Sequence, residues 1–153
     1  MDLTVAVIGA GRSEPATDAT AEEVGSRLAQ AGVVVVCGGL GGVMAAACRG
    51  ARAAGGRTVG ILPGTTAREA NPWVDLALPT GLGEARNVLV VRAGSAVIAV
   101  GGGFGTLSEL AFARKLDVPV VGLDTWRLPD DGIVHVDAPE EAVREALAAA
   151  RRG

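Results

Sequence analysis

The stretch from Ala96 to Glu109 reads AVIAVGGGFGTLSE, and it contains the pattern that decides the fold. Its first part, Ala96 to Val100, is continuously apolar, glycines follow, and a helical pattern extends from residue 106 to residue 116. Apolar runs that do not alternate with polar residues are typical of strands covered on both faces, as in parallel sheets. The stretch therefore predicts a buried strand, a tight turn and a helix that packs back against the sheet.

The same alternation of short apolar runs and helical patterns extends along the whole chain. Strands are predicted at residues 3–8, 33–37, 58–62, 74–78, 96–100, 118–122 and 133–136. Helices are predicted between them, at residues 20–31, 43–54, 84–93, 106–116 and 139–152. Short strand–helix–strand connections imply right-handed crossovers. We therefore expect one α/β domain over residues 1–153, with a doubly wound, Rossmann-like, mostly parallel sheet of about six or seven strands and helices on both faces.

Local patterns also predict where individual helices begin. The residues TAEE from Thr20 form a capping box, in which a hydroxyl and a carboxylate bond to the first free amides of a helix. Thr106 and Glu109 have the same spacing. Asp137 or a neighbour is expected to cap the last helix, with Pro139 in its first turn.

Charge and cysteine content limit the classes of function. The 153 residues carry a net charge of −3, and no cluster of basic residues forms a surface for nucleic acid. No apolar run approaches the roughly 18 residues that span a membrane. Two cysteines, Cys37 and Cys48, do not make a disulfide framework, and no ligand spacing suggests a metal site. We expect a cytoplasmic protein without a metal, and with neither nucleic acid nor a membrane as partner.

Glycines gather directly after three of the predicted strands. These ten glycines are Gly9 and Gly11, then Gly38, Gly39, Gly41 and Gly42, and finally Gly101, Gly102, Gly103 and Gly105. If the sheet is parallel, all three clusters lie along one edge, and each opens a helix whose free N–H groups attract anions. The alternative is that glycine only makes tight turns here. Because the clusters share one edge, we predict a phosphate-binding site.

The first glycine cluster does not match a dinucleotide fingerprint. The residues from Gly9 to Glu14 read GAGRSE, which begins like G-x-G-x-x-G but ends on an acid. Cys37 stands where an acidic residue would hold a ribose, and the chain has no P-loop motif. This leaves a mononucleotide-like or sugar-phosphate ligand. Arg12 and Ser13 are either phosphate donors or part of a solvated loop.

Two charged residues are the chemical candidates. Glu109, in the first turn of the predicted phosphate-binding helix, could stabilise a sugar cation or orient a water molecule, or it could only complete the capping box with Thr106. Arg86 lies at the start of a helix, where a cation opposes the helix dipole. It could contact a phosphate or Glu109, or it could pair with Glu84 or be exposed. Trp73 could cover a planar ring of the ligand, although a place at the edge of the core is favoured.

The run from Ala85 to Glu109 resembles the LOG-type superfamily, often labelled lysine decarboxylases, whose signature P-G-G-x-G-T-x-x-E follows an upstream Arg-Lys. The likeness covers nearly the whole chain, including the turn Gly11-Arg12-Ser13 and the segment from Cys37 to Met44. The resemblance implies a Rossmann-like fold and a homo-oligomer, a dimer or a tetramer.

In LOG enzymes the Arg and the Glu are catalytic and cleave the N-glycosidic bond of cytokinin riboside 5′-monophosphates or other nucleoside monophosphates. Carried over by motif, Arg86 and Glu109 would be the catalytic pair. The residues that the glycine clusters and the resemblance place at the ligand are Gly9, Gly11, Arg12, Ser13, Gly38, Gly39, Gly42, Met44, Gly101, Gly102, Gly103, Phe104, Gly105 and Thr106.

Two positions differ from the LOG signature, because Gly101 replaces its Pro and Asn87 replaces its Lys. This form is more similar to the branch that includes molybdenum cofactor carrier proteins, which bind a phosphorylated pterin. We therefore expect a binding protein for a phosphorylated nucleotide-like or pterin ligand, with the molybdenum cofactor or a nucleoside monophosphate as the bound molecule and no required cofactor. The alternatives are a nucleoside 5′-monophosphate phosphoribohydrolase and a structural or regulatory oligomer with a vestigial site.

Overall fold

Strands and helices alternate along the chain, as its apolar runs predict. The strands are β1 (Thr4–Gly9), β2 (Val34–Cys37), β3 (Thr58–Leu62), β4 (Leu76–Pro79), β5 (Ala96–Val100), β6 (Val120–Leu123) and β7 (Val134–Val136). The α-helices are α1 (Pro15–Gln30), α2 (Val43–Ala53), α3 (Asn87–Ala93), α4 (Phe104–Lys115) and α5 (Pro139–Ala150), and the 3-10 helices are η1 (Ala67–Glu69) and η2 (Gly83–Arg86).

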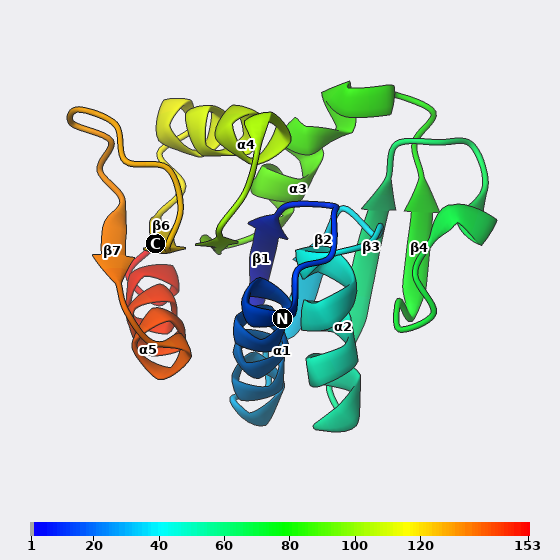
Figure 1. The fold of residues 1–153 in the computed structure, drawn as a ribbon, viewed down its shortest axis with the longest axis horizontal. Helices are drawn as coiled ribbons and strands as arrows, with labels where there is room; N and C mark the ends of the chain where they lie inside the picture. Colours follow the sequence, from blue (N-terminus) through cyan, green and yellow to red (C-terminus); the bar gives the residue numbers. More distant parts are fainter. Residues whose placement is uncertain (1) are drawn as a thin grey trace.

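All the strands are parallel and form one sheet in the order β4-β3-β2-β1-β5-β6-β7 (Figure 1). This computed structural model describes residues 2–153. The strand order reverses between β1 and β5, which defines the predicted doubly wound, Rossmann-like fold. None of the helices formed by the described residues combines the length and the apolar character that a membrane crossing requires.

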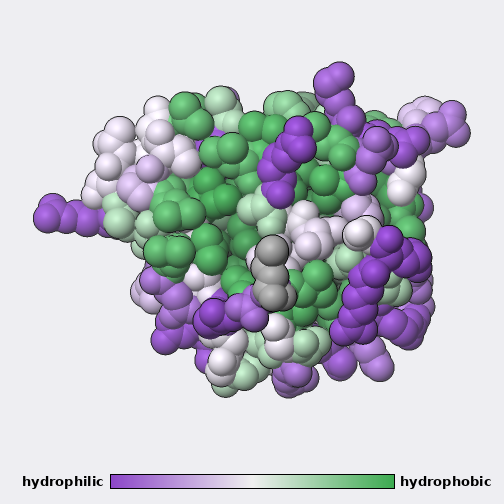
Figure 2. Space-filling model, turned by 180° about the vertical axis from the view of Figure 1, so that it is seen from behind, coloured by the Kyte–Doolittle hydropathy of each residue, from purple (hydrophilic) through white to green (hydrophobic). Residues whose placement is uncertain are grey.

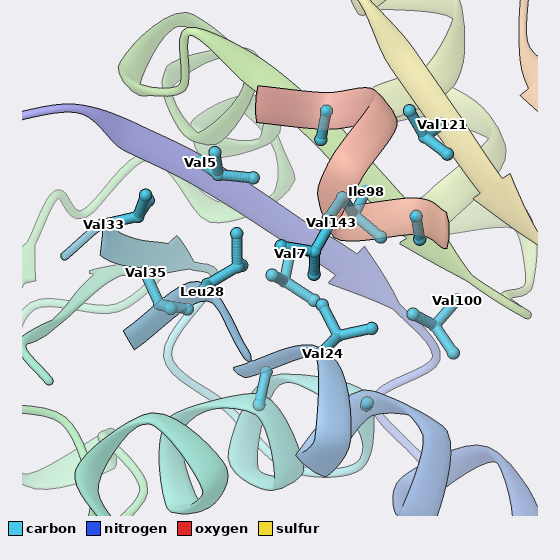
Figure 3. Close-up of a cluster of buried hydrophobic side chains, with 14 of the residues drawn as sticks. Val5, Val7, Val24, Leu28, Val33, Val35, Ile98, Val100, Val121 and Val143 are labelled. Atoms are coloured by element: carbon cyan, nitrogen blue, oxygen red, sulfur yellow. The ribbon is translucent and has the colours of Figure 1, made fainter. Parts of the chain in front are cut away.

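Different helices bury the two faces of the sheet, which explains why the strands are apolar throughout. In β1, Val5 and Val7 pack against α1, α2 and α5 (Figure 3). Ala6 and Ile8 point the other way and pack with residues of α3 and α4. A fully buried side chain of this size contributes roughly 1.5–3 kcal/mol to stability. Because both faces gain from burial, apolar residues do not alternate with polar ones.

The first helix begins earlier than the capping box at Thr20 predicts. The helix α1 starts at Pro15, with Glu14 as its N-cap and without a side-chain cap. Thr20 therefore lies inside the helix, where its Oγ1 donates to the Ala16 carbonyl over 3.2 Å. Proline has a φ angle that suits the first helical position and lacks the N–H that would be unbonded there, so Pro15 begins the helix.

The other two expected caps are also replaced by backbone turns. The helix α4 begins at Phe104 with Gly103 as N-cap, so Thr106 is already helical and caps nothing. The helix α5 has Ala138 rather than Asp137 as N-cap, and this N-cap residue makes no side-chain capping bond among residues 2–153. Pro139 does occupy the first turn of α5, as expected.

Candidate functional site

The glycine clusters meet at the carboxyl edge of the sheet, because parallel strands all end there. Gly9 at the end of β1 pairs in register with Val100 at the end of β5. The Val43 amide, just after the second cluster, donates to the Ala10 carbonyl in the first cluster over 3.0 Å. A cleft of about 420 Å³ opens at this edge. The predicted site residues that line it are Gly9, Gly11, Met44, Arg86, Gly105, Thr106 and Glu109.

The start of α4 carries a row of free amides beside this cleft. Among residues 2–153, no acceptor contacts the backbone N–H groups from Gly102 to Thr106, and Leu107 makes the first bond, to the Gly103 carbonyl over 3.0 Å. Because α4 is 12 residues long, its N-terminus carries the partial positive charge of aligned peptide dipoles. Free amides of this polarity form a typical phosphate-binding site.

Arg86 is a buried cation where η2 joins α3, and only 8% of it is exposed. Its Nη2 donates to the Gly38 carbonyl over 3.3 Å, and its Nη1 donates to the side-chain oxygen of Asn87. Its buried Nε has no partner within residues 2–153, and no ion pair with Glu84 forms. Burial lowers the pKa of Arg86, against the opposing effect of Glu109. Burying a guanidinium with an unbonded N–H destabilises the folded protein unless an anion accepts a hydrogen bond from that N–H.

The second glycine cluster forms the support for Arg86 rather than the wall of the cleft. A Cβ at Gly38 would lie 2.7 Å from Nη2 of Arg86 and 2.8 Å from the Met44 sulfur, so glycine makes room for the guanidinium. Gly39 has a φ of +78°, and a Cβ there would lie 2.6 Å from Leu62. Neither of these two glycines lines the cleft, and Gly42 does not line it either.

Glu109 is a buried carboxyl group whose role is not helix capping. It is 7% exposed, lines the cleft and has no hydrogen-bond or ionic partner among the residues described. Because α4 begins at Phe104, Glu109 lies beyond the reach of the first free amides, which excludes the capping-box alternative. Burial raises the pKa of Glu109 to about 7, although the positive charge of Arg86 lowers it. A carboxyl group with this pKa exchanges its proton near neutral pH and is suited to acid–base or hydrogen-bonding roles.

Two residues that sequence reasoning missed connect the helices of the site. The Asn87 side-chain amide donates to Ser108 Oγ over 3.1 Å, and Ser108 donates to the Gly105 carbonyl over 2.6 Å. Asn87 also accepts from Arg86, so this chain of bonds fixes the guanidinium relative to the start of α4. The signal in the sequence was the replacement of the family's Lys by Asn87, because an amide can both donate and accept.

Several predicted residues lie outside the lining of the cleft. Arg12 and Ser13 are exposed, and Ser13 donates to the carboxylate of Asp18 in α1. Phe104 is 82% exposed, and the centre of its ring lies 5.7 Å from the centre of the tilted Trp126 ring. Gly101, Gly102 and Gly103 form the turn that precedes α4, and none of them lines the cleft.

Trp73 belongs to the edge of the core, which is the interpretation that the sequence favoured. It packs against the small cluster of Cys37, Met44 and Cys48. The guanidinium of Arg49 lies 5.2 Å from the centre of the Trp73 ring. Trp73 does not line the cleft.

This combination of features defines a Rossmann-like protein with a glycine-lined cleft at the carboxyl edge of its sheet. Residues 2–150 match the sequence model of the SLOG cluster4 family, and the chain belongs to this family. The resemblance to the LOG-type superfamily, nearest to the molybdenum cofactor carrier branch, is thereby confirmed together with the structural matches below.

Three similar proteins agree in length with this chain. An uncharacterized protein of Archaeoglobus fulgidus is 40% identical over 145 residues, which are 95% of each chain. The molybdenum cofactor binding protein of Rippkaea orientalis has a TM-score of 0.91 and 33% identity over 97% of both chains. The Moco carrier protein of Chlamydomonas reinhardtii has a TM-score of 0.89 and 30% identity over 100% of both chains.

Proposed function

We propose that this protein is a molybdenum cofactor carrier-like binding protein, whose ligand is a phosphorylated pterin or a nucleotide-like molecule. One observation carries the proposal: the free amides from Gly102 to Thr106 begin α4, and two of the residues that carry them, Gly105 and Thr106, line the same cleft as the incompletely bonded guanidinium of Arg86. Amides at a helix N-terminus and a guanidinium are complementary to the oxygens of one phosphate group. The similarity to carrier proteins of the same length supports this function.

The rest of the cleft suits the ring portion of such a ligand. Leu40, Met44 and Pro63 supply apolar lining, and Met44 adapts readily to flat surfaces because its side chain is flexible. Glu109 lines the same cleft and, when protonated, can donate a hydrogen bond to a ring nitrogen or oxygen. The molybdenum cofactor would be the cargo of this site, held through its phosphate and its pterin.

The second candidate function is hydrolysis of a nucleoside 5′-monophosphate, and the burial of Glu109 beside Arg86 favours it. In this reaction, water adds to C1′ of the ribose, the bond to the base breaks, and the base leaves with a proton. Glu109 would stabilise the cationic sugar or orient the water, and Arg86 would hold the phosphate. Both functions use the same anion site, so they differ in turnover and not in binding.

A titration with a defined set of compounds distinguishes these functions. The protein is titrated by calorimetry with the molybdenum cofactor and with the common nucleoside 5′-monophosphates, and each mixture is then analysed for free base by chromatography. We expect binding without release of base. Release that falls by at least roughly 100-fold in Glu109→Gln would establish the hydrolase instead. If no compound binds, both proposals fail and the vestigial-site hypothesis remains.

We also propose that the chain assembles as a homo-oligomer, a dimer or a tetramer, in the cytoplasm. The face opposite to the one viewed in Figure 1 has a broad hydrophobic area (Figure 2). Large apolar side chains that are exposed in the single chain are Leu76, Leu78, Leu82, Leu89, Phe104, Leu128 and Val134. A broad exposed apolar area of the kind seen in Figure 2 supports association with another protein chain.

A further inference from the structure

Two side chains of a loop distant in sequence donate hydrogen bonds to backbone carbonyls of the turn that precedes α4. Thr125 Oγ1 donates to the Gly101 carbonyl over 2.7 Å. Trp126 Nε1 donates to the Gly103 carbonyl over 3.0 Å. The Gly101 amide is used as well, because it donates to the Leu123 carbonyl over 2.9 Å. The carbonyl oxygens of Gly101 and Gly103 are thus engaged by the segment after β6, and the Gly103 carbonyl also accepts from the Leu107 amide. Within residues 2–153, the amides from Gly102 to Thr106 stay free.

We infer that Thr125 and Trp126 are positioning residues, which hold the glycine turn so that its free amides face the phosphate of the ligand. The inference rests on the proposed function, since it assigns the support of the same anion site. An anion needs N–H groups on one side of a turn, and carbonyl oxygens that rotate toward it would repel it. Hydrogen bonds to the carbonyls of Gly101 and Gly103 oppose that rotation.

The turn needs such support because its own backbone is permissive. Gly101 has a φ of +57° and Gly102 a φ of +116°, which are angles that residues with side chains rarely adopt. Consecutive glycines populate many conformations, so a single arrangement of their amides must be selected by contacts from outside the turn. Thr125 and Trp126 are the side chains that make those contacts to the carbonyls.

The loop that carries Thr125 and Trp126 is itself fixed at its far end. The two Asp131 carboxylate oxygens accept from the Leu128 amide over 3.0 Å and from the Ile133 amide over 2.9 Å. His135 of β7 lies 3.3 Å from the same carboxylate. The Trp126 ring is also tilted by 37° against Phe104, the first residue of α4. Trp126 therefore contacts both the turn and the helix that follows it.

The test compares Thr125→Val and Trp126→Phe with the wild type. Valine keeps the shape of threonine and phenylalanine keeps a ring for Phe104, but neither can donate to a carbonyl. Affinity for GMP, guanosine and inorganic phosphate is measured by calorimetry. We expect each variant to bind GMP and phosphate roughly fivefold to tenfold more weakly, with guanosine unaffected. Thr125→Ser is expected to restore the affinity, and Trp73→Phe, which changes the other tryptophan, is expected to leave it unchanged.

The possible results separate this inference from the proposed function. If the wild type binds neither GMP nor phosphate, the proposed anion site is wrong and the inference falls with it. If the wild type binds both and the two variants bind equally well, the inference alone is overturned. If one variant unfolds, the folded one decides alone: weaker binding of GMP and phosphate with guanosine unaffected supports the inference, and unchanged binding overturns it.

Discussion

Replacing Glu109 by Gln is expected to stabilise the protein at about pH 8 by on the order of 3 kcal/mol. The carboxyl group is buried, which raises its pKa to about 7 from an ordinary value of 4.5. At a pH between these two pKa values, the Glu109 carboxyl group has lost its proton in the unfolded chain but still holds it in the folded protein. The free energy of unfolding therefore falls as the pH rises. Above pH 7 the whole penalty is present. A glutamine amide at this position would carry no charge at any pH and would avoid the penalty.

Chemical denaturation at about pH 4 and at about pH 8 measures this difference directly. Wild type is expected to lose stability through this group between the two conditions, and Glu109→Gln is expected to lose much less. Glu84→Gln is the matched control, because Glu84 lines the same cleft but is exposed. Its substitution is expected to change stability by less than about 0.5 kcal/mol. Parallel pH profiles for wild type and Glu109→Gln would contradict the prediction.

Gly42→Ala and Gly105→Ala are expected to have opposite effects on the stability of the protein. Gly42 has a φ of +60°, and a Cβ there would lie 2.1 Å from the Ala10 carbonyl oxygen. Gly42→Ala is therefore expected to cost at least about 3 kcal/mol, because backbone strain and a backbone clash combine. In the described part of the chain, no atom lies within 4 Å of the position of a Cβ at Gly105, and its φ lies outside the left-handed region. Gly105→Ala is expected to keep the fold and to gain up to about 1 kcal/mol of helix propensity.

Gly105 is expected to matter for ligand binding, although its replacement does not destabilise the fold. Within residues 2–153, no atom occupies the space beside Gly105, which lines the cleft next to the free amides. A methyl group there would obstruct a phosphate that approaches the backbone, so Gly105→Ala is expected to weaken GMP binding at least roughly tenfold. Denaturation and calorimetry on both variants make the comparison. Unchanged GMP affinity in a folded Gly105→Ala protein would show that the ligand does not approach this turn.

The sheet and the edge that carries the site follow from sequence because both depend on short-range patterns. The apolar run from Ala96 to Val100 does not alternate, which requires a strand covered on both faces. Once the strands are parallel, the glycines that follow β1, β2 and β5 must share one edge. Arg86 was a candidate because a cation at a helix start opposes the helix dipole. Glu109 was a candidate because it follows the third glycine cluster, although a capping box with Thr106 was the local alternative.

The helix starts and the supporting contacts could not be derived in this way. The capping-box spacing of Thr106 and Glu109 occurs inside α4, because the preceding glycines let the helix begin at Phe104. The contacts of Thr125 with Gly101 and of Trp126 with Gly103 each join residues that lie far apart in sequence. They depend on β5 and β6 being neighbours, and no local pattern encodes that pairing.

The central proposal is that the protein recognises its ligand through a phosphate held by free amides at the start of α4 and by Arg86. Calorimetric titration with GMP and with guanosine, under identical buffer and salt, tests it most directly. Several charge-assisted hydrogen bonds are lost without the phosphate, so guanosine is expected to bind at least roughly 100-fold more weakly than GMP. Equal affinities for the two compounds would contradict the account.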